Sequence, residues 1–372
     1  MNLTLFTSHF EGVEDPRQES KVTHPLFDIL FVSLCAVAAG AEGWQDIEEY
    51  AHGYLDWFQE HGFLSNGVPV DDTIARIMSR IEPKQFRQCF IQWMQSVHKL
   101  SGGALVAIDG KTLRGSYNRE DRFSTIHMVN AYACENRIVI GQLRTDTKSN
   151  EITAIPHLIQ LLDIKGALVS IDAMGCQKDI AEAIIKKKAD YLLTVKANQE
   201  TLFEAIKHEF SAIGSTSDTQ LEKHHGRVEA REYEVLTVSG RKKGFSGWKN
   251  IKTIGRAISF HQKKGKPPHI EYRYYISSAN LTKEQFAQAV RGHWGIESRL
   301  HWVLDATMKE DDCQIYKDNG PENLAVLRQL SLNMLRAEPT KISMRRKQKR
   351  AWMKVEFLEQ ILAAGISDIG KN

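Results

Sequence analysis

The sequence predicts an α/β protein in which a helical region precedes a region that contains a sheet. From Pro25 to about Leu100, apolar residues recur at helical spacing. A Ser-Gly-Gly segment at 101–103 marks the best boundary, and beyond it short apolar strands alternate with helices, the order typical of an α/β sheet. A β-rich stretch follows from about 231 to 277, and helical spacing returns near 282.

The individual elements follow from these patterns. The run from Leu26 to Ala41 is apolar but contains Asp28 and is shorter than the roughly 20 residues of a membrane span, so we interpret it as a buried helix. We expect helices near 151–162, 177–188, 199–213, 282–308 and 321–337. We expect strands at 104–109, 124–134, 137–144, 167–172, 191–196, 231–238, 251–260 and 270–277.

Composition narrows the class of protein without indicating an activity. The 372 residues are 42% hydrophobic and 26% charged, as expected for an ordinary globular protein with two domains and a tail. The five cysteines form no Cys-x-x-Cys pair, which argues against a zinc ribbon or a disulfide framework and favours a reducing compartment. The first residues lack a basic start followed by an apolar core, so we expect a cytoplasmic protein without a membrane partner.

Charge is unevenly distributed along the chain. The formal net charge of +3 is only mildly basic and does not by itself indicate a nucleic-acid partner. Basic residues crowd one short C-terminal stretch: Lys341, Arg345, Arg346, Lys347, Lys349, Arg350 and Lys354. Such a cluster could neutralise several phosphates. A solvated helix face or a frayed tail explains the same run equally well.

Two apolar runs end in a carboxylate. Asp109 follows ALVAI and Asp172 follows ALVSI. Ligands of open α/β sheets collect at the carboxyl ends of strands, so we expect both aspartates at one rim. Each aspartate alone is weak support for a site, because an aspartate at a strand end is more often a turn residue or a helix cap. Asp109 is followed by Lys111 and Arg114, which suit an anionic partner.

A second group of ionisable residues lies in the helix expected near 282–308. On a regular helix, four residues spaced by four positions would form one slowly drifting stripe: His293, Glu297, His301 and Asp305. Trp294, Leu300, Trp302 and Leu304 would then pack inward. A polar, solvent-facing side explains this pattern as well as a site does. A zinc hydrolase is disfavoured, because the order His-Glu-x-x-His is absent.

The two aspartates and the helical glutamate predict more together than singly. Phosphoryl transfer on nucleic acid without a covalent enzyme intermediate uses two divalent ions about 3.5 to 4 Å apart. Three or four carboxylates supply the charge and the oxygen ligands that Mg²⁺ prefers. Strand-end aspartates combined with a helical glutamate would suit such a pair of ions.

Long blocks of the sequence occur in a fixed order: IDGKTLRGS, TDTKSNEITAIPHLIQLLDIKGALVSIDAMGCQKDIA, HGRVEAR, RYYISS and HWGIESRLHWVLDATMKEDDC. These blocks, and the N-terminal part from DPRQESK onward, closely resemble the H-repeat-associated proteins, a group of insertion-sequence transposases of the DDE type. The resemblance spans nearly the whole chain. It implies a ribonuclease-H-like catalytic core with a β-rich insertion between the second aspartate and the glutamate.

The resemblance also implies an activity and a metal site. Asp109, Asp172 and Glu297 match the metal-binding acids of these transposases in order, and two Mg²⁺ ions, which Mn²⁺ could replace, would support cleavage and strand transfer of insertion-sequence DNA ends. One departure concerns the residues around the glutamate. Related transposases often carry Tyr, Arg, Glu and Lys where this chain has Val290, His293, Glu297 and Leu304. How a hairpin DNA end would be held is therefore not implied.

The candidate DNA contacts are basic residues and histidines near these acids or at the start of the insertion: Lys111, Arg114, Lys196, Arg227, Arg231, His293, Arg299 and His301. Surface ion pairs explain Arg227 and Arg231 equally well. For Lys111, Arg114 and Lys196, which lie just beyond expected strands, the alternative is a structural ion pair with a neighbouring acid.

Three regions are expected: an N-terminal helical transposase-associated domain at 1–100, a DDE catalytic domain at 101–340 with its insertion at about 214–280, and a basic helical tail at 341–372. The expected partners are double-stranded DNA, as element ends and as target, and further copies of the chain on paired ends, by analogy with transposases. Two alternatives remain open. One is a ribonuclease-H-like nuclease without strand transfer, and the other is a catalytically decayed DNA-binding relative.

Overall fold

The computed structural model describes residues 4–118, 120–121, 124–145, 151–212, 220–224, 227–238, 244–263 and 269–366. The chain divides into two compact units. Unit 1 contains Met1–Lys99, Gly110–Asn150 and Glu297–Asn372, and unit 2 contains Leu100–Asp109 and Glu151–Ile296.

The N-terminal part of unit 1 is helical, with α1 (Thr4–Phe10), α2 (Leu26–Ala39), α3 (Trp44–Gly53), α4 (Leu55–Glu60), α5 (Asp71–Met78) and α6 (Pro83–Val97). Helix α2 is apolar on all sides and buried along its whole length, as expected for a core helix. It ends at Gly40, whose φ of 106° lies in the left-handed region that glycine tolerates. Among the described helices, none alone is long and apolar enough to span a membrane, and the pair α2 and α3 reaches that length only across a 95° bend.

Three helices form the C-terminal part of unit 1: α12 (Gly320–Ala337), α13 (Met344–Met353) and α14 (Val355–Ile366). Helix α12 packs against α2, α6 and α14 and is buried on nearly all sides. Several of its buried polar side chains are hydrogen-bonded, which offsets the cost of burying them. Asn323, for example, donates to the carbonyl oxygens of Met78 at 2.8 Å and Ile81 at 3.1 Å.

Unit 1 also contains a β-hairpin made of β2 (Ile126–Ala133) and β3 (Ile138–Arg144). The strand order is β3-β2-β1, and β1 (Leu105–Leu113) contributes its second half to this unit. Asn333 of α12 covers the edge strand β3, because its Oδ1 accepts from Val139 N at 3.0 Å and its Nδ2 donates to Val139 O at 2.8 Å. A covered edge does not pair with other strands.

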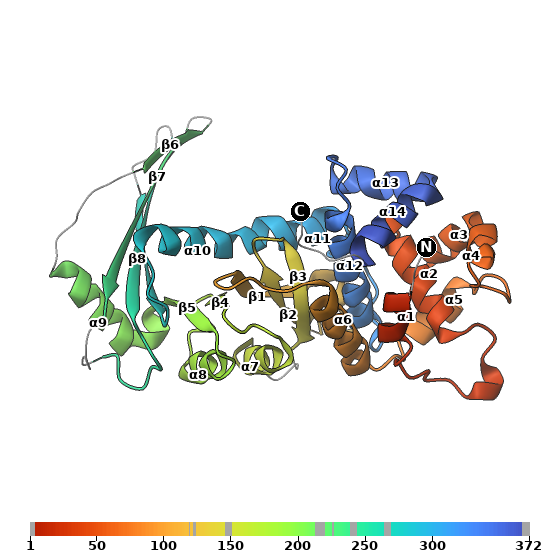
Figure 1. Cartoon of the computed structure of the whole chain (residues 1–372), viewed down its shortest axis with the longest axis horizontal. Helices are drawn as coiled ribbons and strands as arrows, with labels where there is room; N and C mark the ends of the chain where they lie inside the picture. The colour runs from red at the N-terminus through yellow and green to blue at the C-terminus, as the bar shows by residue number, and fades with distance from the viewer. Residues whose placement is uncertain are drawn as a thin grey trace. The chain divides into compact units, whose positions relative to one another are not determined.

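Unit 2 is built on parallel strands. The first half of β1 pairs with β4 (Leu168–Ile171), which pairs with β5 (Asp190–Val195). Helices α7 (Glu151–Leu161) and α8 (Lys178–Lys186) precede β4 and β5, as parallel strands require crossover connections. Within this unit, α7 and α8 lie on one side of the strands and α10 (Lys283–Ile296) on the other (Figure 1).

Long antiparallel strands continue the sheet of unit 2. The order beyond β5 is β9 (His269–Ser277), β8 (Thr253–Lys263), β7 (Arg227–Thr237) and β6 (Gln220–His224), and α9 (Glu200–Ser211) precedes them in the chain. Phe286 of α10 packs on this part of the sheet against Tyr233 and Tyr275. At Gly255 of β8 an added Cβ would lie 2.4 Å from the Phe286 ring, so glycine permits this close approach.

The predicted fold class is confirmed. The chain is α/β, helices precede the strands, and a strand cluster lies between Asp172 and Glu297 in the sequence. Two local expectations are wrong. Strand β1 continues past Asp109 to Leu113, because β2 flanks it beyond its last pair with β4. The helix expected near 282–308 is interrupted after α10 by a π-helical turn, η4 (Glu297–His301), before α11 (Trp302–Ala306).

Candidate active site

Asp109 and Asp172 occupy matched positions on adjacent parallel strands of unit 2. Strands β1 and β4 pair in register up to Ile108 opposite Ile171, so each aspartate is the next residue along its strand direction. Neighbouring strands lie about 4.8 Å apart. Both side chains are half-buried. Asp109 and Asp172 therefore lie on neighbouring strands at the carboxyl end of β4, and β1 continues past Asp109 to Leu113.

Asp172 follows β4 and opens a tight turn. Its Oδ1 accepts hydrogen bonds from Met174 N at 3.0 Å and Gly175 N at 3.2 Å. Burial raises the pKa of Asp172, and these backbone amides and the charge of Lys196 partly offset that effect. At Gly175 an added Cβ would lie 2.3 Å from the Ile171 side chain, so glycine keeps the turn this close. A half-buried carboxylate with a raised pKa is one that a bound cation would stabilise.

Two of the predicted basic contacts lie near Asp172 in unit 2. Lys196 is exposed at the end of β5, the strand next to β4. His293 of α10 is hydrogen-bonded through Nδ1 to Ser170 Oγ at 3.0 Å. Burial lowers the pKa of His293 to about 4, so its ring is neutral near neutral pH. Sequence reasoning missed Ser170, because one serine in an apolar strand forms no motif.

The π-helical turn η4 carries three predicted residues in unit 1. Glu297 is 64% exposed and His301 is 6% exposed, and Glu297 Oε2 lies 3.5 Å from His301 Nδ1. Burial lowers the pKa of His301, and Glu297 partly offsets that effect. Arg299 is exposed, and its carbonyl oxygen accepts a hydrogen bond from Arg336 of α12. Glu297 and His301 can each offer a ligand atom to a metal ion, and π-turns are frequent at functional sites.

The π-turn interrupts the regular helix on which the four-residue spacing predicted a stripe, although Glu297 and His301 remain 3.5 Å apart. A π-turn inserts one residue relative to the α-helical repeat, so the residues after it rotate onto another face. His301 is buried whereas Glu297 is exposed. The expectation that Trp294 and Trp302 pack inward is wrong, since their side chains are 47% and 62% exposed. The Trp294 ring instead faces the Arg273 guanidinium at 4.2 Å.

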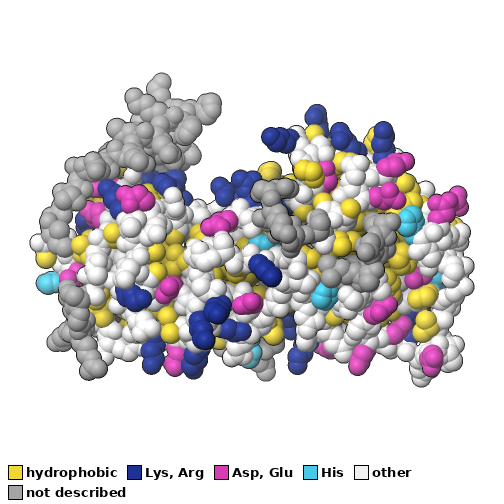
Figure 2. Space-filling view, viewed as in Figure 1, with side chains coloured by type: hydrophobic (Ala, Val, Ile, Leu, Met, Phe, Trp, Pro, Cys, Tyr) yellow, Lys and Arg dark blue, Asp and Glu magenta, His cyan; other side chains and the backbone are white. Residues whose placement is uncertain are grey.

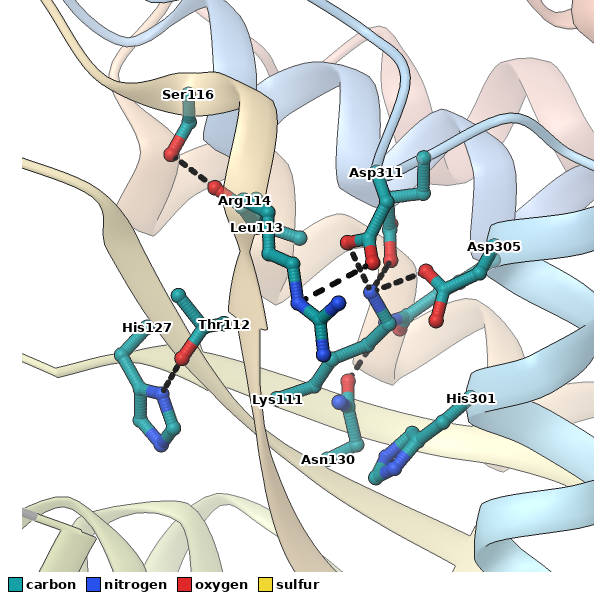
Figure 3. Close-up of polar contacts among 12 residues, drawn as sticks. Lys111, Thr112, Leu113, Arg114, Ser116, His127, Asn130, His301, Asp305 and Asp311 are labelled. Carbon is teal, nitrogen blue, oxygen red and sulfur yellow. Dashed lines mark hydrogen bonds and ion pairs between the residues drawn. The ribbon is translucent and has the colours of Figure 1, made fainter. Parts of the chain in front are cut away.

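Lys111 lies at the centre of a carboxylate cluster in unit 1 (Figure 3). Its Nζ lies 2.6 Å from Asp305 Oδ1, 3.0 Å from Glu310 Oε2 and 3.3 Å from Asp311 Oδ1, and only 7% of the side chain is exposed. Burial alone would lower the pKa of Lys111, but Glu310 and Asp305 outweigh burial and raise it. The sequence left two interpretations of Lys111 open, a phosphate contact and a structural ion pair with a neighbouring acid. The structure contains the ion pair.

Sequence reasoning did not single out Glu310 and Asp311 as partners of Lys111. The acidic run at 310–312 is the signal in the sequence that indicates a basic partner. That partner, Lys111, lies about two hundred positions earlier, so the sequence does not pair the two. Arg114 follows β1 and remains 79% exposed, with Nε 3.5 Å from Asp311 Oδ2 (Figure 3). Its guanidinium therefore remains available at the surface.

The two arginines of the insertion lie on β7. The backbone of Arg227 pairs with His224 of β6 and Lys263 of β8, and its side chain lies outside the described part of the structure. Arg231 is exposed and pairs with Ser259. Both positions belong to the antiparallel part of unit 2.

The residue types predicted for the metal site fit a hard divalent cation. Asp109, Asp172 and Glu297 offer carboxylate oxygens, which Mg²⁺ prefers, and the exposure of Glu297 leaves room for water and phosphate oxygens. His301 offers a nitrogen donor, which suits Mn²⁺ or another transition metal better than Mg²⁺. The raised pKa of Asp172 also fits a carboxylate that takes up a cation.

Comparison with known proteins identifies relatives along the whole chain. The family model described as "DDE_Tnp_1-associated" matches residues 7–94, and the model described as "Transposase DDE domain" matches residues 100–334. The chain is 44% identical over 380 residues to the "Putative transposase YncI" of Escherichia coli O157:H7, covering 100% of this chain and 97% of that protein. It is 44% identical over 378 residues to the "H repeat-associated putative transposase YhhI" of Escherichia coli K12, covering 99% and 100%.

Solved structures are also similar to this chain. One of them is the cryo-EM structure of the piggyBac transposase synaptic complex with hairpin DNA, with a TM-score of 0.43 and 12% identity, covering 96% of this chain and 80% of that chain.

Proposed function

Because this chain belongs to the DDE transposase family, we propose that it cleaves the DNA ends of an insertion sequence and joins them to target DNA, with Asp109, Asp172 and Glu297 binding two divalent metal ions. The observation that carries the proposal is the register of β1 and β4, in which Asp109 and Asp172 each follow one of two paired residues on neighbouring strands. Mg²⁺ is the proposed ion, and Mn²⁺ could replace it, because three carboxylates supply hard oxygen donors.

The direction of β1 supports Glu297 as the third acid. Side chains two positions apart on a strand share a face, so Asp109 and Lys111 point to the same side of β1. Lys111 Nζ lies 2.6 Å from Asp305 Oδ1, and Asp305 lies eight positions after Glu297 on the same run of helical turns. We therefore propose Glu297, on the same run of helical turns as Asp305, as the third acid.

The proposed reaction consists of two in-line displacements at phosphorus. Water first attacks a phosphodiester at the element end, its oxygen bonds to phosphorus, and the 3′ oxygen leaves with a proton. The freed 3′-hydroxyl then attacks a phosphodiester of the target, its oxygen bonds to phosphorus with loss of its proton, and the 3′ oxygen of the target strand leaves and takes up a proton. Bound metal ions supply activation of the attacking oxygen and stabilisation of the leaving oxygen. The three acids would supply the negative charge that holds the metal ions. The further contribution of the chain would be mainly to position the DNA.

Exposed basic residues would position the DNA. Arg114, Lys196, Arg231 and Arg299 are exposed and can meet phosphates. His293 and His301 are proposed to contact the DNA end near the acids, and Arg227 is proposed as a further contact from β7. Lys111 is proposed to act through its ion pairs, since its ammonium group is buried among carboxylates.

We further propose that the chain acts in the cytoplasm, where reduced cysteines are expected, and that it works as a homo-oligomer on paired ends. Mass photometry of the protein alone and with end duplexes tests the oligomer. A mass of one chain per duplex under conditions that support joining would contradict it.

The central test is strand cleavage and strand transfer with the purified chain, the DNA that flanks its gene, a target plasmid and Mg²⁺ or Mn²⁺. The wild type should cleave the ends and produce joined product. D109N, D172N and E297Q should lose both reactions and keep DNA binding, because each change removes one ligand charge at nearly constant volume. D179N is the matched control, since Asp179 is an exposed carboxylate of α8 in unit 2.

Each outcome of this test separates the alternatives. Cleavage without joining, even with precleaved 3′-hydroxyl ends, would identify a nuclease. DNA binding without cleavage in either metal would identify a decayed relative. Metal-dependent cleavage retained in one of the three variants would remove that residue from the site.

A further inference from the structure

The basic run near the C-terminus forms one exposed face of α13. Arg345, Arg346, Lys349 and Arg350 are all exposed. Pairs spaced by four residues return to the same side of a helix, so 345 with 349 and 346 with 350 line one face of α13. Lys and Arg side chains gather over this helix in the space-filling view (Figure 2).

The opposite face of α13 is docked in unit 1. Lys347 is 3% exposed, and its Nζ donates to the Leu335 carbonyl at 2.8 Å and lies 3.0 Å from Glu338 Oε2. Ala351 is fully buried. Ser343 caps the first turn, since its Oγ accepts from Arg346 N. The cationic face therefore belongs to an anchored helix, and the basic run is divided between one buried anchor and exposed charges.

The surroundings of this face favour an anionic partner. Residues 339–355 contain no Asp or Glu. Lys341 and Lys354 flank α13 and are exposed, so the positive charge continues past both of its ends. Like charges held this close repel one another unless counter-ions or a partner neutralise them.

We propose that this face of α13 binds the phosphate backbone of double-stranded DNA without reading its sequence. The inference rests on the proposed function, because DNA is the substrate there. Duplex DNA carries about one negative charge per 1.7 Å of its axis, and the ten residues of α13 span about 15 Å, so several phosphates lie within reach of one helix length. A contact of this kind suits target DNA, because target DNA does not carry the sequence of the element end.

The experiment measures DNA affinity against salt with the full chain in EDTA, so that no cleavage occurs. Fluorescence anisotropy uses two labelled duplexes, one with the element end and one unrelated, in about 50 to 200 mM NaCl. The test variant is R345Q/R346Q/K349Q/R350Q. The charge-matched control replaces four other exposed lysines, as K84Q/K165Q/K178Q/K186Q.

We expect the test variant to bind both duplexes more weakly. The slope of log K against log salt should become shallower by about 0.9 for each phosphate that the helix no longer neutralises. The control should change the slope much less, because it removes charge away from this face. K347M should lower the melting temperature and leave the slope unchanged, because Lys347 is an internal anchor.

Three results would overturn the inference while the proposed function stands: an unchanged slope in the test variant, equal changes in test variant and control, or weaker binding of the end duplex alone. These results count against the inference alone when the wild type binds DNA and cleaves it with Mg²⁺. A wild type that binds neither duplex would overturn both this inference and the proposed function.

Discussion

Two groups of carboxylates in this chain differ in how their charge is balanced. In unit 2, Asp109 and Asp172 lie on neighbouring parallel strands, and Asp172 accepts hydrogen bonds from two backbone amides. In unit 1, Asp305, Glu310 and Asp311 surround the buried ammonium of Lys111. Residue type alone therefore does not separate a cation site from a structural ion-pair cluster.

Burial raises the pKa of one aspartate in each group, Asp172 in unit 2 and Asp305 in unit 1, so this shift does not separate the groups. The neighbouring cation does. Around Lys111, the acids outweigh burial and raise the pKa of the lysine, so the ammonium group stays charged among them. A carboxylate that already has a buried cation in direct contact gains less from a metal ion than one whose charge is only partly offset.

The largest expected effect is a loss of cleavage rate when Asp172 is replaced by asparagine. The same replacement at Asp311, in the other group, is the comparison. D172N should lower the rate of metal-dependent cleavage by at least about 10³-fold, equivalent to about 4 kcal/mol of transition-state stabilisation. D311N should leave the rate within a few-fold of wild type, because Asp311 contacts Lys111 and Arg114. Single-turnover cleavage of an end duplex measures both. Equal decreases in the two variants would erase the distinction between the groups.

The next effect concerns stability. K111M should lower the free energy of unfolding by about 3 to 5 kcal/mol, because removing one partner leaves Glu310, which is 2% exposed, without its buried counter-charge. Urea unfolding followed by tryptophan fluorescence measures the decrease. The triple variant K111M/D305N/E310Q should recover part of it, since the stranded charges are removed as well. No recovery would mean that Lys111 contributes packing rather than charge balance.

The fold could be predicted because its signals are local. Apolar strands, helical spacing and the glycine-rich boundary placed most elements within a few residues. Asp172 follows the end of its strand as predicted, whereas Asp109 lies within β1. The π-turn could not be predicted, because its carbonyl at Arg299 is held by Arg336 from a distant helix. Lys111 and its acids are equally distant in sequence. The exposure of Trp302 likewise depends on the face to which the π-turn rotates it.

The two histidines extend the comparison from acids to bases. His301 has Glu297 at 3.5 Å, whereas His293 bonds to Ser170 and its pKa is lowered by burial to about 4. Above pH 6.5, His293 is neutral in both the folded and the unfolded chain. As the pH falls from 6.5 towards 4, only the unfolded chain takes up the proton, so stability decreases.

That decrease should reach about 3 kcal/mol near pH 4, since one pKa unit corresponds to about 1.4 kcal/mol. Urea unfolding of wild type and H293Q across this pH range measures it. The difference between the two proteins should change by this amount between pH 7 and pH 4, because H293Q removes the titrating ring. Parallel curves would show that His293 is protonated in the folded chain.

The smallest expected effect is stabilisation by metal, and it tests the comparison without DNA. Ligand that binds only the folded chain stabilises it by about 1.4 kcal/mol at ten times its dissociation constant. Mg²⁺ or Mn²⁺ should therefore raise the melting temperature of the wild type and of D311N. The melting temperature of D172N should stay unchanged, because Asp172 belongs to the proposed cation site and Asp311 does not. The shift should shrink at acid pH, where protons compete for a carboxylate whose pKa is raised. A shift that persists in D172N and disappears in D311N would reverse the assignment of the two groups.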